Sequence, residues 1–262
     1  IPWCKKYNIF VKDKMFGLYF IHFHYLAMII RIYLSKIYNF ALSSLNIWKP
    51  FIWLDSIPQF KPIFEKIEKK LNSLSDGQVT KSLMEYDVFG SFLVHLLFPS
   101  LQNEDGMVYT PVFFAEFIIK KTISIKTISK KTHIPKVMDP TCGTGRFLIA
   151  YINFVYKGIS DRLEHAKLYM KDIIENMVAI DSNPVAILAS FANIVIQSKK
   201  LQISNLDFKE ICDNFYCCNL LDFHSLSFSF VNQKFRYIFG NLPWNVLNNI
   251  ENPAVKQKVE KI

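Results

Sequence analysis

The spacing of hydrophobic and polar residues divides the chain into two regions. From residue 1 to about residue 105, aromatic, leucine and isoleucine side chains recur at helical intervals. One example is the series Phe64, Ile67 and Leu71, which has lysines between its apolar positions. A second amphipathic stretch covers residues 84–97 and ends before a proline. We therefore predict a helical N-terminal region over residues 1–105.

The second region, residues 106–262, alternates short β-rich runs with helical stretches. This alternation is typical of a parallel sheet with helices on its faces, so we predict an α/β fold with a Rossmann-like sheet. The predicted helices cover residues 111–125, 145–156 and 184–198, and the predicted strands cover residues 136–138, 177–180, 215–218 and 237–239. Because a doubly wound sheet has further strands beyond its switch point, we expect this sheet to be truncated at the C-terminus.

Composition and charge narrow the function classes. The 262 residues, of which 51% are hydrophobic, can bury one sizeable core and leave room for a small companion domain. Lys and Arg number 31 against 22 Asp and Glu, and this net charge of +9 favours a polyanionic partner such as nucleic acid. The apolar run from Met15 to Ile30 contains two histidines and is shorter than the roughly 20 residues of a membrane span, so we expect no membrane partner.

The cysteines indicate a cytoplasmic protein without a metal centre. There are five of them, they form no CxxC pair, and no signal peptide is evident, which favours a reducing compartment. Cys212, Cys217, Cys218 and His224 could be imagined as metal ligands, but adjacent cysteines do not easily share a tetrahedral site. We expect these cysteines to behave as small buried side chains.

A glycine-containing loop follows the first predicted strand and leads into a helix. Its sequence from Asp139 to Leu148 is DPTCGTGRFL. Gly143 and Gly145 have no Cβ, so the backbone can turn tightly and approach a ligand. Leu148 occupies the place of the third glycine in the dinucleotide fingerprint, which disfavours pyrophosphate recognition. We interpret the loop as a cradle for a nucleotide-like cofactor, with a glycine-rich turn that binds nothing as the alternative.

Two further polar positions follow predicted strands. Asp181 ends the second strand, where a carboxylate can accept two hydrogen bonds from a ribose diol. It could equally cap the helix that follows. The tetrad Asn241-Leu242-Pro243-Trp244 follows the fourth strand and presents an amide, a rigid turn and an aromatic face, which suit a planar amino-bearing group. An ordinary turn with a core tryptophan is the alternative.

The glycine loop and the tetrad, in this order and spacing, resemble the motifs of the adenine-N6 DNA methyltransferases of restriction-modification systems. The resemblance covers roughly residues 86–245. It implies S-adenosylmethionine as the cofactor, DNA as the partner, and methyl transfer to the N6 amino group of a flipped adenine. It also leaves room for a separate specificity or restriction subunit. A methyltransferase acting on a protein glutamine or an RNA base, and a truncated fragment without catalytic activity, are the alternatives.

The resemblance assigns a role to individual cofactor-binding residues. They are Tyr109, Thr110 and Pro111 over the methionine carboxylate, Asp139, Thr141, Gly143 and Gly145 around the methionine and sugar, Asp181 at the ribose, and Asn219 and Leu220 at the cofactor adenine. Asn219 stands where the family usually has an aspartate, and Asp222 is a competing candidate for that contact.

The resemblance also assigns the catalytic residues to Asn241, Leu242, Pro243 and Trp244. The side-chain oxygen of Asn241 and the main-chain carbonyl of Leu242 would accept the hydrogens of the target amino group, and Trp244 would stack on the flipped base. The family has proline where this chain has Leu242. Because Pro243 biases the preceding residue toward an extended conformation, the carbonyl can still reach the required position.

Overall fold

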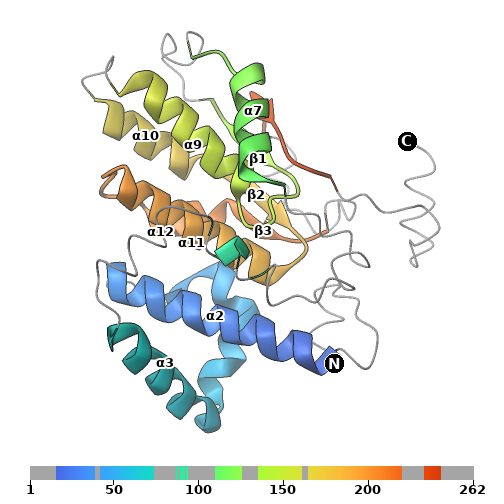
Figure 1. The fold of residues 1–262 in the computed structure, drawn as a ribbon, viewed down its shortest axis with the longest axis vertical. Helices are drawn as coiled ribbons and strands as arrows, with labels where there is room; N and C mark the ends of the chain where they lie inside the picture. Colours follow the sequence, from blue (N-terminus) through green and yellow to red (C-terminus); the bar gives the residue numbers. More distant parts are fainter. Residues whose placement is uncertain are drawn as a thin grey trace, which may run out of the picture.

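The structure is a computed structural model that combines helices with a small parallel sheet (Figure 1). It describes residues 16–38, 42–73, 87, 89–91, 93, 110–125, 135–160, 165–219 and 233–242.

Helices form the described part of the N-terminal region, as predicted. The two α-helices are α2 (Phe16–Tyr38) and α3 (Lys61–Ser73), and between them lie the 3₁₀ helices η1 (Leu42–Ser44), η2 (Asn46–Ser56) and η3 (Pro58–Phe60). Pro50 lies inside η2, where its missing N–H disfavours a regular α-helix. Trp48 and Phe51 of η2 are fully buried, so this irregular segment is held by its side chains. None of the described helices combines the length and hydropathy that a bilayer span requires.

The sheet contains four parallel strands in the order β3-β2-β1-β4. They are β1 (Val137–Asp139), β2 (Met177–Asp181), β3 (Phe215–Cys217) and β4 (Tyr237–Ile238). Each lies within one residue of the predicted range at either end. The parallel register pairs Val137 with Met177 on one side and with Tyr237 on the other. The predicted α/β, Rossmann-like fold class is therefore confirmed.

In the part of the second region that the structure describes there are five helices. They are α7 (Val112–Thr122), α9 (Arg146–Ile159), α10 (Ala166–Glu175), α11 (Pro184–Lys200) and α12 (Phe208–Asp213). Three of them match the predicted helices, with α9 and α11 extending a few residues further toward the C-terminus. Helices α10 and α12 were not predicted.

Helix α11 joins the two regions of the chain. Every residue from 184 to 198 is buried, because α11 packs against β2 and β3 on the sheet side and against α2 and η2 of the N-terminal region (Figure 1). Its sequence is apolar on nearly all faces, which is typical of a helix enclosed on all sides. One continuous hydrophobic core therefore extends from α2 to the sheet, and it fixes the strand ends at which the candidate site lies.

Candidate functional site

The strand order places a topological switch point between β1 and β4. From β1 the chain proceeds to β2 and β3, and it then returns to add β4 on the other side of β1. Open parallel sheets bind ligands at such a switch point. The glycine loop follows β1, and residues 239–242 follow β4. The Phe239 N–H donates to the Met138 carbonyl at 3.0 Å, and the Thr141 hydroxyl donates to the Asn241 carbonyl at 3.0 Å. The fold thus brings the two predicted motifs together.

The glycine loop has a backbone that requires glycine. Gly143 and Gly145 have φ angles of 51° and 85°, in the left-handed region that side chains disfavour. A Cβ on Gly145 would also lie only 2.5 Å from the Ser190 hydroxyl oxygen of α11. The Cys142 N–H donates to the Ile180 carbonyl at 2.8 Å, which attaches the loop to the end of β2. The loop is therefore closely fitted between α11 and the sheet.

Asp181 connects the glycine loop to the start of α11. Its Oδ2 accepts a hydrogen bond from the Gly143 N–H at 2.9 Å, and its Oδ1 accepts one from the Asn183 N–H at 2.8 Å. The helix cap is Asn183, whose side-chain oxygen accepts from the Val185 N–H at 2.9 Å. The alternative that Asp181 caps the helix is therefore wrong. Burial raises the pKa of Asp181, against the lowering effect of these two N–H groups.

Asp139 is a buried carboxyl group with one unused oxygen. The residue is 1% exposed, and its Oδ1 accepts from the Thr141 N–H at 3.1 Å. Its Oδ2 has no hydrogen-bond partner within the described part of the chain. Burial, opposed by the Thr141 N–H and assisted by the nearby Asp181 charge, raises the pKa of Asp139 to about 8. A carboxyl group that has a raised pKa and an oxygen without a described partner, beside a switch point, is typical of a ligand site.

The residues that follow β4 lie against this carboxyl. A Cβ on Gly240 would lie 2.6 Å from Asp139 Oδ1 and 3.1 Å from the Thr141 hydroxyl oxygen. Only glycine lets the chain pass so close to the loop. Asn241 is half-buried, and the Leu242 side chain is 59% exposed. The backbone that carries the predicted catalytic asparagine is thus held against the predicted cofactor cradle.

The other predicted cofactor residues that the structure describes lie near the glycine loop and the ends of the strands. The Thr110 carbonyl accepts from Arg146 Nη1 at 2.7 Å, which places the segment before α7 beside the glycine loop. Asn219 lies just beyond β3, and the preceding Cys218 N–H donates to the Asp181 carbonyl at 3.0 Å. Pro111 is the N-cap residue of α7. The remaining candidates lie outside the described residues: Tyr109, Leu220, Asp222, Pro243 and Trp244.

Four residues that the sequence analysis did not single out connect the loop to its surroundings. Asp87 accepts hydrogen bonds from the Thr144 hydroxyl at 2.7 Å, Arg146 Nε at 2.6 Å and Asn193 Nδ2 at 2.6 Å. The only local signal was the Asp-Val-Phe-Gly segment at residues 87–90, in which the Gly90 N–H donates to Asp87 at 2.7 Å.

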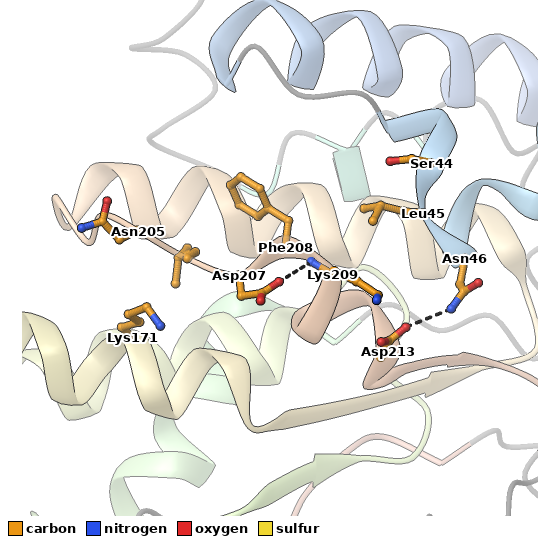
Figure 2. A pocket seen from close by; sticks show the side chains of 10 residues that line it. Ser44, Leu45, Asn46, Lys171, Asn205, Asp207, Phe208, Lys209 and Asp213 are labelled. Atoms are coloured by element: carbon orange, nitrogen blue, oxygen red, sulfur yellow. Dashed lines mark hydrogen bonds between the residues drawn. The ribbon is translucent and has the colours of Figure 1, made fainter.

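A cavity of about 750 Å³ lies away from the carboxyl ends of the strands, beside η1, α10 and α12 (Figure 2). Its polar side chains serve local structure. Asn46 donates to Asp213 at 2.9 Å, and Asp207 caps α12 by accepting from the Lys209 and Glu210 N–H groups. No group of three or more potential metal ligands comes together in the regions that the structure describes, and His224 lies outside them. We therefore assign the functional site to the switch point.

Comparisons with known proteins identify a family for most of the chain. A family model described as N-6 DNA methylase matches residues 84–260. Among solved structures, the chain is similar to one titled "cryoEM structure DrdV-DNA complex", with a TM-score of 0.57 and 16% sequence identity. The similarity covers 91% of this chain but only 26% of that one, and at this identity it shows the fold alone. No curated protein sequence matches the chain.

Proposed function

The chain belongs to the N-6 DNA methylase family, and on this premise we propose that it transfers a methyl group from S-adenosylmethionine to the N6 amino group of an adenine flipped out of DNA. We assign this activity to the modification side of a restriction-modification system. The observation that carries the proposal is the hydrogen bond from Thr141 to the Asn241 carbonyl. It joins a glycine loop suited to the cofactor with a tetrad suited to the target base.

The acceptor groups at the switch point fit S-adenosylmethionine. This cofactor supplies an electrophilic methyl group on a sulfonium centre and carries an ammonium group and a ribose diol. The unused Oδ2 of Asp139 suits the ammonium group, directly or through water. Each Asp181 oxygen accepts one protein hydrogen bond and, having a second lone pair, can accept another from a ribose hydroxyl. Thr110, Thr141, Gly143 and Gly145 would complete the methionine and sugar cradle.

Tyr109 and Pro111 would help to close over the methionine carboxylate. Asn219 would contact the cofactor adenine, and Leu220 would pack on its face. The cofactor would thus lie across the ends of β1, β2 and β3.

The tetrad would hold the target amino group for attack. The Asn241 side-chain oxygen and the Leu242 carbonyl would each accept one amino hydrogen, which orients the nitrogen lone pair toward the methyl group. Trp244 would stack on the base, and Pro243 would keep Leu242 extended. The net charge of +9 supports a nucleic-acid substrate, and the solved neighbour is a DNA complex by its title.

The test is transfer of labelled methyl groups from S-adenosylmethionine to DNA, RNA and protein in parallel, followed by identification of the modified nucleoside. We expect N6-methyladenine in DNA, and a rate loss on the order of 100-fold in Asn241→Ala. Asn176→Ala is the matched control, because Asn176 lies just before the amino end of β2 and its side chain donates to the Asp172 carbonyl at 2.9 Å. Label that enters only protein or RNA, or an Asn241→Ala variant as active as the unmodified chain, would contradict the proposal.

A further inference from the structure

We propose that Asp87 is a positioning residue that sets both walls of the cofactor site, by holding the glycine loop on one side and, through Arg146, the Thr110 segment on the other. This inference rests on the proposed function and adds to it a residue outside the glycine loop and the tetrad.

The Asp87 carboxylate is the centre of a buried hydrogen-bond network. The residue is 8% exposed. Its Oδ1 accepts from the Gly90 N–H at 2.7 Å and from Asn193 Nδ2 at 2.6 Å. Its Oδ2 accepts from the Thr144 hydroxyl at 2.7 Å and from Arg146 Nε at 2.6 Å. These four donors occupy the acceptor sites that a carboxylate offers, and the Arg146 charge balances the buried Asp87 charge.

The donors to Asp87 come from separate parts of the site. Thr144 lies between the two left-handed glycines of the loop, and Arg146 is the first residue of α9. Asn193 lies in the middle of the buried helix α11, and its Nδ2 also donates to the Thr144 carbonyl at 2.9 Å. One carboxylate therefore ties the loop to the most enclosed helix of the fold.

Arg146 extends the network to the opposite wall. While its Nε donates to Asp87, its Nη1 donates to the Thr110 carbonyl at 2.7 Å. The planar guanidinium fixes the angle between these two bonds, which an ammonium group would not do. Asp87 thus sets, through Arg146, the position of Thr110, which the resemblance places over the methionine carboxylate, and it also sets the glycine loop. Loss of the Asp87 charge should loosen both walls together.

The decisive variant is Asp87→Asn, which keeps the shape of the side chain but replaces one acceptor oxygen with an NH₂ group facing donors. Asp55→Asn is the matched control. Asp55 pairs with Arg31 and accepts from Trp48 Nε1 at 3.0 Å, so it makes the same kind of charged contact within the N-terminal helices. Titration calorimetry measures the Kd for S-adenosylmethionine, and amide hydrogen exchange measures the protection of residues 110–115 and 143–147.

We expect Asp87→Asn to raise the Kd for S-adenosylmethionine roughly tenfold or more, because it removes charge-assisted hydrogen bonds that hold the site. Asp55→Asn should change this Kd by less than about twofold. Exchange should accelerate in residues 110–115 and 143–147 and stay unchanged in α3. In turnover, the KM for S-adenosylmethionine should rise while the KM for DNA stays constant. A folded Asp87→Asn chain with unchanged Kd, or equal weakening by both variants, would overturn the inference.

Two further arms keep the test decisive. If Asp87→Asn does not fold, Arg146→Lys replaces it, because lysine keeps the positive charge but cannot hold Asp87 and the Thr110 carbonyl at a fixed angle. An unchanged Kd for S-adenosylmethionine in Arg146→Lys would also overturn the inference. If the unmodified chain binds no S-adenosylmethionine, the proposed function fails. Exchange at residues 110–115 would then decide the positioning role independently, and equal protection in Asp87→Asn and the unmodified chain would refute it.

Discussion

Replacement of Gly145 by alanine should destabilise the chain through two separable effects. The first is the backbone: Gly145 has φ 85° and ψ 22°, a left-handed conformation that costs a residue with a Cβ about 1–2 kcal/mol. The second is space: the added Cβ would lie 2.5 Å from the Ser190 hydroxyl oxygen and 3.3 Å from Ser190 Cα. Because Ser190 is fully buried in α11, the helix cannot easily move away.

The two effects together predict a substantial loss. Overpacking of a filled interior costs typically about 1–3 kcal/mol, so Gly145→Ala should lower the free energy of unfolding by roughly 2–5 kcal/mol in total. This is a large part of the 5–15 kcal/mol that is typical of folded domains.

Urea-induced unfolding, followed by circular dichroism, measures this loss. A double-mutant cycle with Ser190→Ala separates the two effects, because the alanine removes the hydroxyl oxygen but leaves the backbone of residue 145 unchanged. We expect Gly145→Ala/Ser190→Ala to recover the steric part, about 1 kcal/mol or more, and to retain the backbone part. A Gly145→Ala chain within about 0.5 kcal/mol of the unmodified protein would refute the loop geometry. A strictly additive double mutant would refute the contact with Ser190.

Two other predictions concern His24 and Leu242. His24 is 3% exposed among Phe20, Phe51 and Trp53, and its Nδ1–H donates to the Phe20 carbonyl at 2.6 Å. Burial lowers the pKa of His24 from 6.5 to about 4. The imidazole of His24 is protonated more readily in the unfolded chain, so the free energy of unfolding falls as the pH falls from 6.5 toward 4. At pH 5 this loss should be about 2 kcal/mol in the unmodified chain and should be absent in His24→Phe. Measurement of the unfolding free energy of both chains at pH 7 and pH 5 tests this, and a constant difference between them would contradict it. Leu242→Pro should leave stability unchanged within about 0.5 kcal/mol, since the Leu242 side chain is 59% exposed, and should methylate DNA at least as fast as the unmodified chain. A methylation rate that falls more than about tenfold would mean that residue 242 does not adopt a proline-compatible backbone.

The four strands could be predicted from the sequence because each is a short apolar run with polar or glycine residues at its end. Helix α10 was missed although its buried residues Ala166, Met170, Ile173 and Ile174 follow a helical period, so the signal was present. The 3₁₀ conformation of η2 was not predictable from periodicity, since it depends on Pro50 and on the burial of Trp48.

The candidate site was predictable only in part. The glycine loop and Asp181 follow strands directly, so local sequence was sufficient to find them. Which of Asp181 and Asn183 caps α11 depends on side-chain geometry, and both residue types are good caps. Asp87 gave almost no signal, because the partners Thr144, Arg146 and Asn193 lie 57, 59 and 106 residues away. Contacts at such separations follow from the packing of α11 and the loop, which no local pattern encodes.

The most direct test of the cofactor site is a calorimetric titration of S-adenosylmethionine into the folded chain and into Asp181→Ala. Asp213→Ala serves as the control, because Asp213 is exposed at the end of α12, before the amino end of β3, and its carboxylate accepts a hydrogen bond from Asn46. We predict binding with a Kd on the order of micromolar that is lost in Asp181→Ala and retained in Asp213→Ala. A folded unmodified chain that binds no S-adenosylmethionine, or a folded Asp181→Ala that binds it equally well, would contradict the assignment of the cofactor site to the glycine loop and Asp181.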